Sequence, residues 1–170
     1  MNPRQLRAKF AQIEGIIFDV DGVLTNGQII YTDDGHELKQ FHVQDGASIK
    51  LLMEHGVDVA LITGRRSPVV ARRARELGIT HLAQGALSKV AALAGLIDDG
   101  FTATNLAAVG DDIQDLALFE DAAITMSITV PNAHPAVLAR ADWITQRRGG
   151  DGIVVDIAEQ ILKARGQWPW

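Results

Sequence analysis

Short apolar segments typical of β-strands alternate about five times with segments of helical spacing along this chain of 170 residues. The predicted strands are residues 15–20, 57–62, 79–83, 106–109, 123–126 and 143–144. The predicted helices are residues 47–54, 68–77, 88–97, 115–120, 134–139 and 153–162, and Ser67 is predicted as the N-cap of the second. Such alternation indicates βαβ units. It predicts an α/β, Rossmann-like fold, a mostly parallel sheet with helices on both faces, in a single domain spanning 1–170.

One segment departs from this alternation. Residues 28–31 and 37–43 have strand character, and they flank Asp33-Asp34-Gly35, a sequence typical of turns. They predict a β-hairpin, a flap at about 28–43 that follows the first strand. An isolated hairpin is only marginally stable in water, so its apolar residues need a covering surface.

The composition excludes several classes of function. Asp and Glu number 21 against 16 Lys and Arg, a formal net charge of −5, whereas a nucleic-acid-binding protein needs a basic surface. The chain has no cysteine, which excludes disulfides, zinc–thiolate sites and a thiol nucleophile. No apolar run approaches the roughly 18 residues of a membrane helix, and the N-terminus lacks the apolar core of a secretory signal. We therefore expect a soluble cytoplasmic protein that binds neither nucleic acid nor membranes.

Polar residues follow the predicted strands at the points where they end. Asp19 and Asp21 come at the end of the first strand, Thr63 follows the second, and Asp111 follows a later one. Lys89 lies in the first turn of a predicted helix. Ligands of open α/β sheets bind beyond the carboxyl ends of the strands. These carboxylates, the hydroxyl and the ammonium are therefore expected to meet at one edge of the sheet.

This set of side chains suits phosphoryl transfer. Clustered carboxylates without thiolates favour a hard divalent cation such as Mg²⁺. A carboxylate such as Asp19 can attack phosphorus and form an aspartyl-phosphate. Asp21, two residues later and on the same face of the strand, can protonate the leaving oxygen and then take a proton from water. The cation, a lysine and hydrogen-bond donors would offset the charge of the phosphoryl group.

The same residues lie in four motifs that resemble those of the haloacid dehalogenase (HAD) superfamily of phosphohydrolases, in the same order. The motifs are DVDGVL at 19–24, TGR at 63–65, Lys89, and GDDIQD at 110–115. The resemblance implies that Asp19 is the nucleophile and that Asp21 is the general acid/base, whose backbone carbonyl also binds Mg²⁺. It further implies that Thr63 binds the phosphoryl group, that Lys89 neutralises charge and that Asp111 binds Mg²⁺, supported by Asp112 or Asp115.

Members of this superfamily usually carry a cap domain, and this chain resembles the capless type. Thr63 follows Asp21 by only 42 residues, which leaves room for the hairpin and one helix. Further segments resemble the 3-deoxy-D-manno-octulosonate 8-phosphate (KDO 8-phosphate) phosphatase family. They are HVQDG at 42–46, TGRRSP at 63–68, LGITHL at 77–82, NAHP at 132–135 and GGDGIVVDI at 149–157.

That resemblance implies Mg²⁺-dependent hydrolysis of KDO 8-phosphate to KDO and inorganic phosphate, a step of lipopolysaccharide synthesis. It also implies a homotetramer in which the hairpins associate and neighbouring subunits close the site in place of a cap. The substrate contacts that it implies are Asp21, His42, Val43, Gln44, Asp45, Gly46, Lys50, Arg65, Arg73 and Lys89. Arginine suits the carboxylate of a sugar acid. Arg72, Arg73 and Arg75 are also explained as a solvated helix face, whereas Arg65 is better placed for binding, on a loop at the rim.

Two alternatives stay open. A phosphatase of a nine-carbon sugar-acid 9-phosphate would share nearly every motif, and pockets discriminate weakly between substrates that differ only in length. A receiver-like signalling domain also uses a phospho-accepting aspartate, an acidic pair, a hydroxyl and a lysine on a parallel sheet. The DxD spacing, the hairpin and GDDIQD have no place in a receiver, so a phosphatase is favoured.

Overall fold

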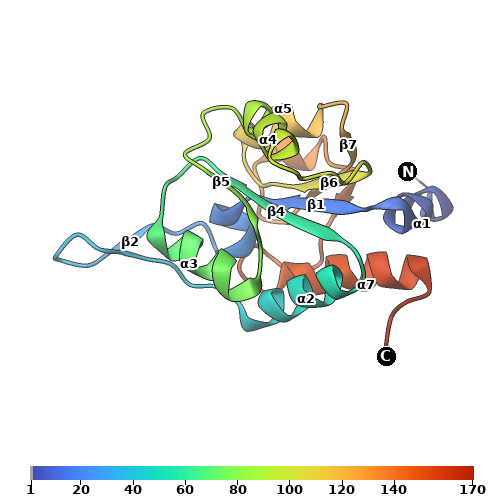
Figure 1. Ribbon diagram of the computed structural model, residues 1–170, viewed down its shortest axis with the longest axis horizontal. Coiled ribbons are helices and arrows are strands. Elements are labelled where there is room, and N and C mark those ends of the chain that lie inside the picture. Colours follow the sequence, from blue (N-terminus) through green and yellow to red (C-terminus); the bar gives the residue numbers. More distant parts are fainter. Residues whose placement is uncertain (1) are drawn as a thin grey trace.

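The computed structural model describes residues 2–170, and its centre is a six-stranded sheet in which every pair is parallel (Figure 1). From edge to edge the strands are β5 (His81–Gln84), β4 (Asp58–Thr63), β1 (Gly15–Phe18), β6 (Leu106–Val109), β7 (Ile124–Thr129) and β8 (Trp143–Ile144). The central strand β1 pairs with β4 on one side and with β6 on the other. The predicted parallel α/β sheet is confirmed, and Asp19 lies directly after its central strand.

Helices cover both faces of the sheet (Figure 1). One face carries α1 (Pro3–Gln12), α2 (Val43–Glu54), α3 (Pro68–Leu77) and α7 (Ile153–Arg165), and the other carries α4 (Lys89–Asp98) and α5 (Leu116–Phe119). A short helix, α6 (Pro135–Leu138), follows β7. Successive residues of a strand point to opposite faces, so Ile16 and Phe18 belong to the first core and Ile17 to the second. Such a continuous apolar run is typical of a central parallel strand.

The predicted hairpin is present but shorter than expected. β2 (Ile30–Tyr31) and β3 (Glu37–Leu38) pair antiparallel as a separate sheet that projects from the body of the molecule (Figure 1). Between β1 and β4 the described chain forms only a short helical turn at Val20–Leu24, this hairpin and α2, so no cap domain lies there. The hairpin leaves apolar side chains exposed to between 42% and 61%: Ile29, Ile30, Tyr31 and Leu38.

Helix α2 begins four residues before the predicted start at 47, so the predicted strand at 37–43 is cut short. His42 is its N-cap, and the ring Nδ1 accepts a hydrogen bond from the N–H of Gln44 at 3.3 Å. Asp45 in the first turn faces the positive end of the helix, which favours an acidic side chain. These polar residues start the helix ahead of the apolar pattern from which the prediction was made.

Ser67 is the N-cap of α3, as predicted, although its hydroxyl makes no capping hydrogen bond. The Ser67 N–H donates to Gln84 Oε1 at 2.7 Å. The predicted helix at 115–120 divides into a 3-10 turn, Ile113–Asp115, and the shorter α5. The predicted end of α3 at Gly78 is confirmed, since this glycine has a left-handed φ of 83°.

Helix α1 was not predicted from the sequence. Asn2 and Gln5 form a capping box at its start, with Pro3 in the first turn. Its Phe10 is buried and lies edge-on to the ring of Trp143, with ring centroids 5.2 Å apart. The Asn-Pro-x-Gln pattern is the signal that could have identified this helix.

No helix within residues 2–170 combines the length and apolar character needed to span a bilayer.

Candidate active site

The side chains that the sequence assigned to one edge of the sheet do meet beyond the carboxyl ends of the strands. Asp19 follows β1, Thr63 ends β4, Asp111 follows β6, and Lys89 begins α4. They surround an open cavity of about 570 Å³. Its lining consists of Asp19, Asp21, Gly27, Thr63, Gly64, Arg65, Ala86, Leu87, Lys89, Asp111, Asp112, Gln114 and Asp115.

Glycine loops pack tightly around the aspartates. Gly22 has a φ of 97°, a conformation that other residues rarely adopt. A Cβ at Gly22 would overlap the carboxylate of Asp111, and a Cβ at Gly149 would overlap the carbonyl of Gly22. The N–H of Gly150 donates to the carbonyl oxygen of Val23 at 2.9 Å. Because glycine has no side chain, the loop at Gly149-Gly150 can pack against the turn at Gly22, and this packing fixes the turn that carries Asp19 and Asp21.

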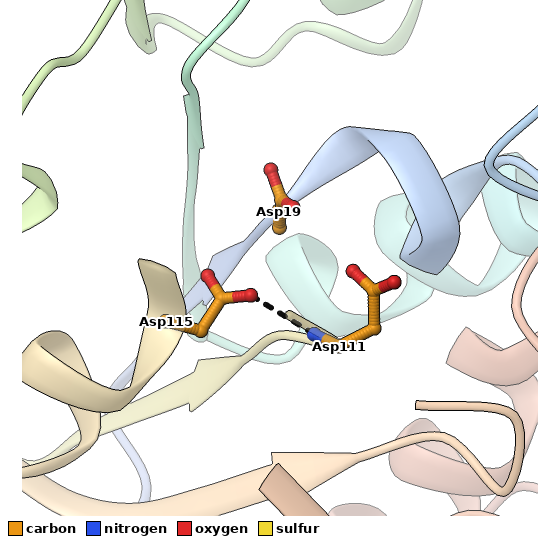
Figure 2. A group of neighbouring side chains, drawn as sticks. All are labelled: Asp19, Asp111 and Asp115. Carbon is orange, nitrogen blue, oxygen red and sulfur yellow. Dashed lines mark hydrogen bonds between the residues drawn. The ribbon is translucent and has the colours of Figure 1, made fainter. Parts of the chain in front are cut away.

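Three carboxylates, those of Asp19, Asp111 and Asp115, lie close together, with one oxygen of each within 4.8 Å of the others (Figure 2). Oδ2 of Asp115 accepts hydrogen bonds from the N–H groups of Asp111 at 2.9 Å and Asp112 at 3.0 Å. Oδ1 of Asp111 is buried and has no hydrogen-bond partner among residues 2–170. An oxygen-only cluster with such an unpartnered oxygen fits a hard divalent cation. Asp112 instead caps the following turn, where it accepts a backbone hydrogen bond at 2.7 Å.

Burial and mutual repulsion raise the pKa of two of these carboxyl groups. Burial is the main cause for Asp111, and the charges of Asp19, Asp115 and Asp112 add to it, giving a pKa of about 7. Burial likewise raises the pKa of Asp19 to about 6, although the nearby ammonium of Lys89 opposes the shift. A bound divalent cation would favour the ionised form of both groups.

Lys89 places a buried positive charge beside Asp19. Its Nζ lies 3.1 Å from Oδ1 of Asp19 and 2.5 Å from Oδ1 of Asp115, and its side chain is only 5% exposed. Burial lowers the pKa of this ammonium, but the charges of the two carboxylates outweigh burial and raise the pKa above its ordinary value. Lys89 is therefore protonated and can offset negative charge that arrives at Asp19.

Asp21 lines the cavity and is paired with a residue that the sequence did not single out. Its Oδ1 forms an ion pair with the ammonium of Lys39, which follows β3 of the hairpin. The same ammonium lies 3.5 Å from Oε1 of Glu37. The signal in the sequence is Glu37-Leu38-Lys39, because residues two apart on a strand point to the same face. That pattern alone does not show whether this side of the hairpin faces Asp21 or the solvent.

Thr63 and Arg65 lie at the end of β4 and in the loop that follows it. The hydroxyl of Thr63 accepts a hydrogen bond from the N–H of Arg65 at 3.3 Å, so its own proton is free to be donated. The Arg65 guanidinium donates to Glu37 Oε1 at 2.9 Å and to the Tyr31 hydroxyl at 3.2 Å. Arg65 therefore connects the cavity to the hairpin.

The other predicted substrate contacts do not line this cavity within the part of the chain that the structure describes. They are His42, Val43, Gln44, Asp45, Gly46, Lys50 and Arg73. The buried carboxylate of Asp45 accepts a hydrogen bond from the N–H of Val154 at 2.8 Å, and so it caps the start of α7. The guanidinium of Arg73 lies over the ring of Phe41, 5.8 Å from its centroid. Contact of these residues with a substrate stays a prediction.

Comparison with known proteins shows the family to which the chain belongs. Residues 81–157 match the family of haloacid dehalogenase-like hydrolases. The 3-deoxy-D-manno-octulosonate 8-phosphate phosphatase KdsC of Escherichia coli strain K12 is 40% identical over 161 residues, which cover 94% of this chain and 85% of that protein.

Solved structures of phosphatases from the same family are also similar to this chain. The 3-deoxy-D-manno-octulosonate 8-phosphate phosphatase of Moraxella catarrhalis, solved in complex with magnesium ion, phosphate ion and KDO, superposes with a TM-score of 0.91 at 40% identity, over 98% of this chain and 95% of that one. The corresponding phosphatase of Yersinia pestis gives a TM-score of 0.89 at 38% identity, over 95% of this chain and 87% of that one. The chain belongs to the 3-deoxy-D-manno-octulosonate 8-phosphate phosphatase family of haloacid dehalogenase-like hydrolases.

Proposed function

We propose that the protein hydrolyses KDO 8-phosphate to KDO and inorganic phosphate in a Mg²⁺-dependent reaction. The observation that carries this proposal is the convergence of Asp19, Asp21, Thr63, Lys89 and Asp111 on one cavity, in a chain of this family. The relative from Moraxella catarrhalis, solved with magnesium, phosphate and KDO, supports both the cation and the substrate. Family membership also argues against the receiver-like alternative.

The carboxylates of Asp19 and Asp111 would hold Mg²⁺, and the unpartnered Oδ1 of Asp111 supports this assignment. Asp115 would support the site, because its Oδ2 accepts hydrogen bonds from the N–H groups of Asp111 and Asp112. The backbone carbonyl of Asp21 is proposed as a further ligand. When bound, Mg²⁺ supplies positive charge that offsets the charge of the phosphoryl oxygens and orients the group for displacement.

The first half of the reaction forms an aspartyl-phosphate. A carboxylate oxygen of Asp19 attacks phosphorus, and the bond from phosphorus to the 8-oxygen of the sugar acid breaks. Asp21 donates a proton to that oxygen, so KDO leaves as an alcohol. The Thr63 hydroxyl can donate a hydrogen bond to a phosphoryl oxygen. The ammonium of Lys89, 3.1 Å from Asp19, offsets the negative charge that the phosphoryl group brings.

The second half releases phosphate. Asp21, now ionised, takes a proton from a water molecule, and the water oxygen attacks phosphorus. The bond between phosphorus and the Asp19 oxygen breaks, which restores the carboxylate and gives inorganic phosphate. The same residue therefore acts first as an acid and then as a base, and the enzyme returns to its starting protonation state.

Mg²⁺ is expected to stabilise the protein more at about pH 8 than at about pH 5.5. With pKa values of about 7 for Asp111 and about 6 for Asp19, protons compete with the cation for both carboxylates in acid. Both values exceed the ordinary 3.8, so the folded state binds more protons, and metal-free stability falls as pH rises from about 4 to about 7. At saturating Mg²⁺ near pH 8 the gain should reach about 3 kcal/mol.

Thermal unfolding in MgCl₂ and in EDTA, at both pH values, measures this difference. Asp111→Asn should lose the Mg²⁺-dependent gain at pH 8, whereas Asp98→Asn, on an exposed part of α4, should keep it. A gain of the same size at both pH values would count against these carboxylates as the metal ligands.

The guanidinium of Arg65 is proposed to bind the carboxylate of the sugar acid. It lies on the rim of the cavity, and its planar donors match a carboxylate.

The preferred length of the substrate is tested by measuring kcat/KM for KDO 8-phosphate and for a nine-carbon sugar-acid 9-phosphate. We expect the first to be at least about 10-fold higher, the discrimination that a small difference in substrate size allows. A higher kcat/KM for the nine-carbon substrate would leave the phosphatase activity standing and would contradict KDO 8-phosphate as the substrate.

We also propose a homotetramer in which the hairpins meet and neighbouring subunits close the site. The exposed side chains of Ile29, Ile30, Tyr31 and Leu38 support this, because four apolar residues on one projecting hairpin leave an unusual amount of apolar surface in water. Light scattering at micromolar concentration should give about four times the chain mass of 18.4 kDa. A monomer under these conditions would contradict the proposal.

A further inference from the structure

Lys39 has a buried side chain, and one of its partners, Asp21, lines the proposed active site. Its side chain is only 2% exposed, although the hairpin that carries it projects from the body of the molecule. The ammonium pairs with Oδ1 of Asp21 and lies 3.5 Å from Oε1 of Glu37. Lysine is rarely buried to this extent unless its charge is compensated. The hairpin therefore brings a compensated positive charge to the proposed acid/base.

The two carboxylate oxygens of Asp21 have different surroundings. Oδ1 is held by Lys39, whereas Oδ2 is buried without a hydrogen-bond partner among residues 2–170. Asp21 belongs to the lining of the cavity, and within the described chain Lys39 does not. The ammonium thus holds one oxygen of the carboxylate without itself reaching the cavity, and it leaves the other oxygen unengaged.

Glu37 extends this arrangement to the rim of the cavity. Glu37 and Lys39 are two residues apart and face the same side of the hairpin. The Glu37 carboxylate also accepts a hydrogen bond from Arg65 at 2.9 Å, and its side chain is only 15% exposed. Lys39 is therefore held between two acids, and its position is fixed from the hairpin side as well as from the side of Asp21.

We propose that Lys39 is a positioning residue: by holding Oδ1 of Asp21, it fixes the orientation of the carboxyl group that the proposed mechanism uses for proton transfer. The proposal rests on the proposed phosphatase function. Proton transfer needs the acid within hydrogen-bond reach of the leaving oxygen, and a small misplacement forfeits much of its contribution. Lys89 already offsets charge at Asp19, 3.1 Å away, so the role of Lys39 is distinct from that of a counter-charge to the phosphoryl group.

A comparison of two substrates tests this role. The alkyl oxygen of KDO 8-phosphate needs a proton to leave, whereas 4-nitrophenolate leaves without one. The ratio kcat/KM reports the steps up to departure of the leaving group, which precede hydrolysis of the aspartyl-phosphate. For Lys39→Met we expect kcat/KM to fall about 10- to 100-fold for KDO 8-phosphate and less than about 3-fold for 4-nitrophenyl phosphate.

Lys9→Met is the matched control. It also removes a lysine from an ion pair, with Asp142 at 2.9 Å, but on α1 and outside the lining of the cavity. Both kcat/KM values should stay within about 2-fold of the wild type. Asp21→Asn should show the same selective loss, and Lys39→Met added to it should cause little further loss, because Lys39 acts through Asp21. Thermal unfolding checks that each variant folds, and Lys39→Gln replaces Lys39→Met if it does not.

Equal losses for the two substrates would overturn the proposal, because Lys39 would then act on the phosphoryl group or on the fold. Unchanged kcat/KM values for both substrates would overturn it as well. A wild-type protein that is inactive on KDO 8-phosphate would instead overturn the proposed function, and this result is visible before any variant is compared.

Discussion

The variant Asp19→Asn is expected to release phosphate from KDO 8-phosphate at least about 10⁴-fold more slowly than the wild type. Its amide has the size of the carboxylate but lacks the negative oxygen that attacks phosphorus. Burial raises the pKa of Asp19 to about 6, so above that pH the fold bears the cost of an ionised buried group. Asn carries no charge, and the metal-free variant should therefore melt at the same temperature as the wild type or higher.

Phosphate release and thermal unfolding are measured on the same preparations, so that activity and stability are compared directly. Asp98→Asn is the matched control, because it makes the same chemical change at an exposed position of α4. It should keep its activity within about 2-fold, as expected for a surface substitution away from the site. Activity of pure Asp19→Asn close to that of the wild type would rule out Asp19 as the nucleophile.

Lys89→Met is expected to lower kcat by about 10²- to 10³-fold, the effect of removing one group that stabilises charge in a transition state. Without metal it should also lower the free energy of unfolding by about 3 kcal/mol, because Asp19 and Asp115 lose a buried partner and repel each other. Methionine keeps most of the apolar stem. Mg²⁺ should therefore restore much of the stability but little of the activity.

Steady-state kinetics and urea unfolding, each in MgCl₂ and in EDTA, measure the two effects. Lys163→Met is the matched control, because Lys163 pairs with Glu159 at 2.5 Å on the exposed side of α7. Loss of that exposed pair should change the free energy of unfolding by no more than about 0.5 kcal/mol. A Lys89→Met variant with nearly unchanged kcat would show that the buried ammonium serves only the fold.

The sheet could be predicted from the sequence because its central strands are buried on both faces. The run Gly15–Phe18 is apolar throughout, and the predicted strands at 106–109 and 143–144 have the bounds that the structure gives them. The start of α2 was predicted too late, because it is set by polar caps rather than by apolar spacing. Helix α1 was missed because only one of its residues, Phe10, is fully buried, so its apolar pattern is weak.

The meeting of the candidate site residues was predictable for a different reason. Asp19, Thr63 and Asp111 come where parallel strands end, and topology alone brings such positions together. The choice between Asp112 and Asp115 depended on side-chain direction within one turn, which spacing does not specify. The pairing of Lys39 with Asp21 depends on how the hairpin is oriented relative to the end of β1, and no periodicity of the sheet encodes that orientation. The hairpin is a separate two-stranded sheet, so its placement rests on individual contacts.

The decisive measurement is release of inorganic phosphate from KDO 8-phosphate by the wild-type protein, in Mg²⁺ and in excess EDTA. We expect rapid release with Mg²⁺, with kcat/KM of about 10⁴ M⁻¹s⁻¹ or more, as is usual for enzymes acting on their own substrates. We expect nearly complete loss of activity in EDTA and recovery when Mg²⁺ is restored. No release in the presence of Mg²⁺, or equal release in EDTA, would contradict the proposed function.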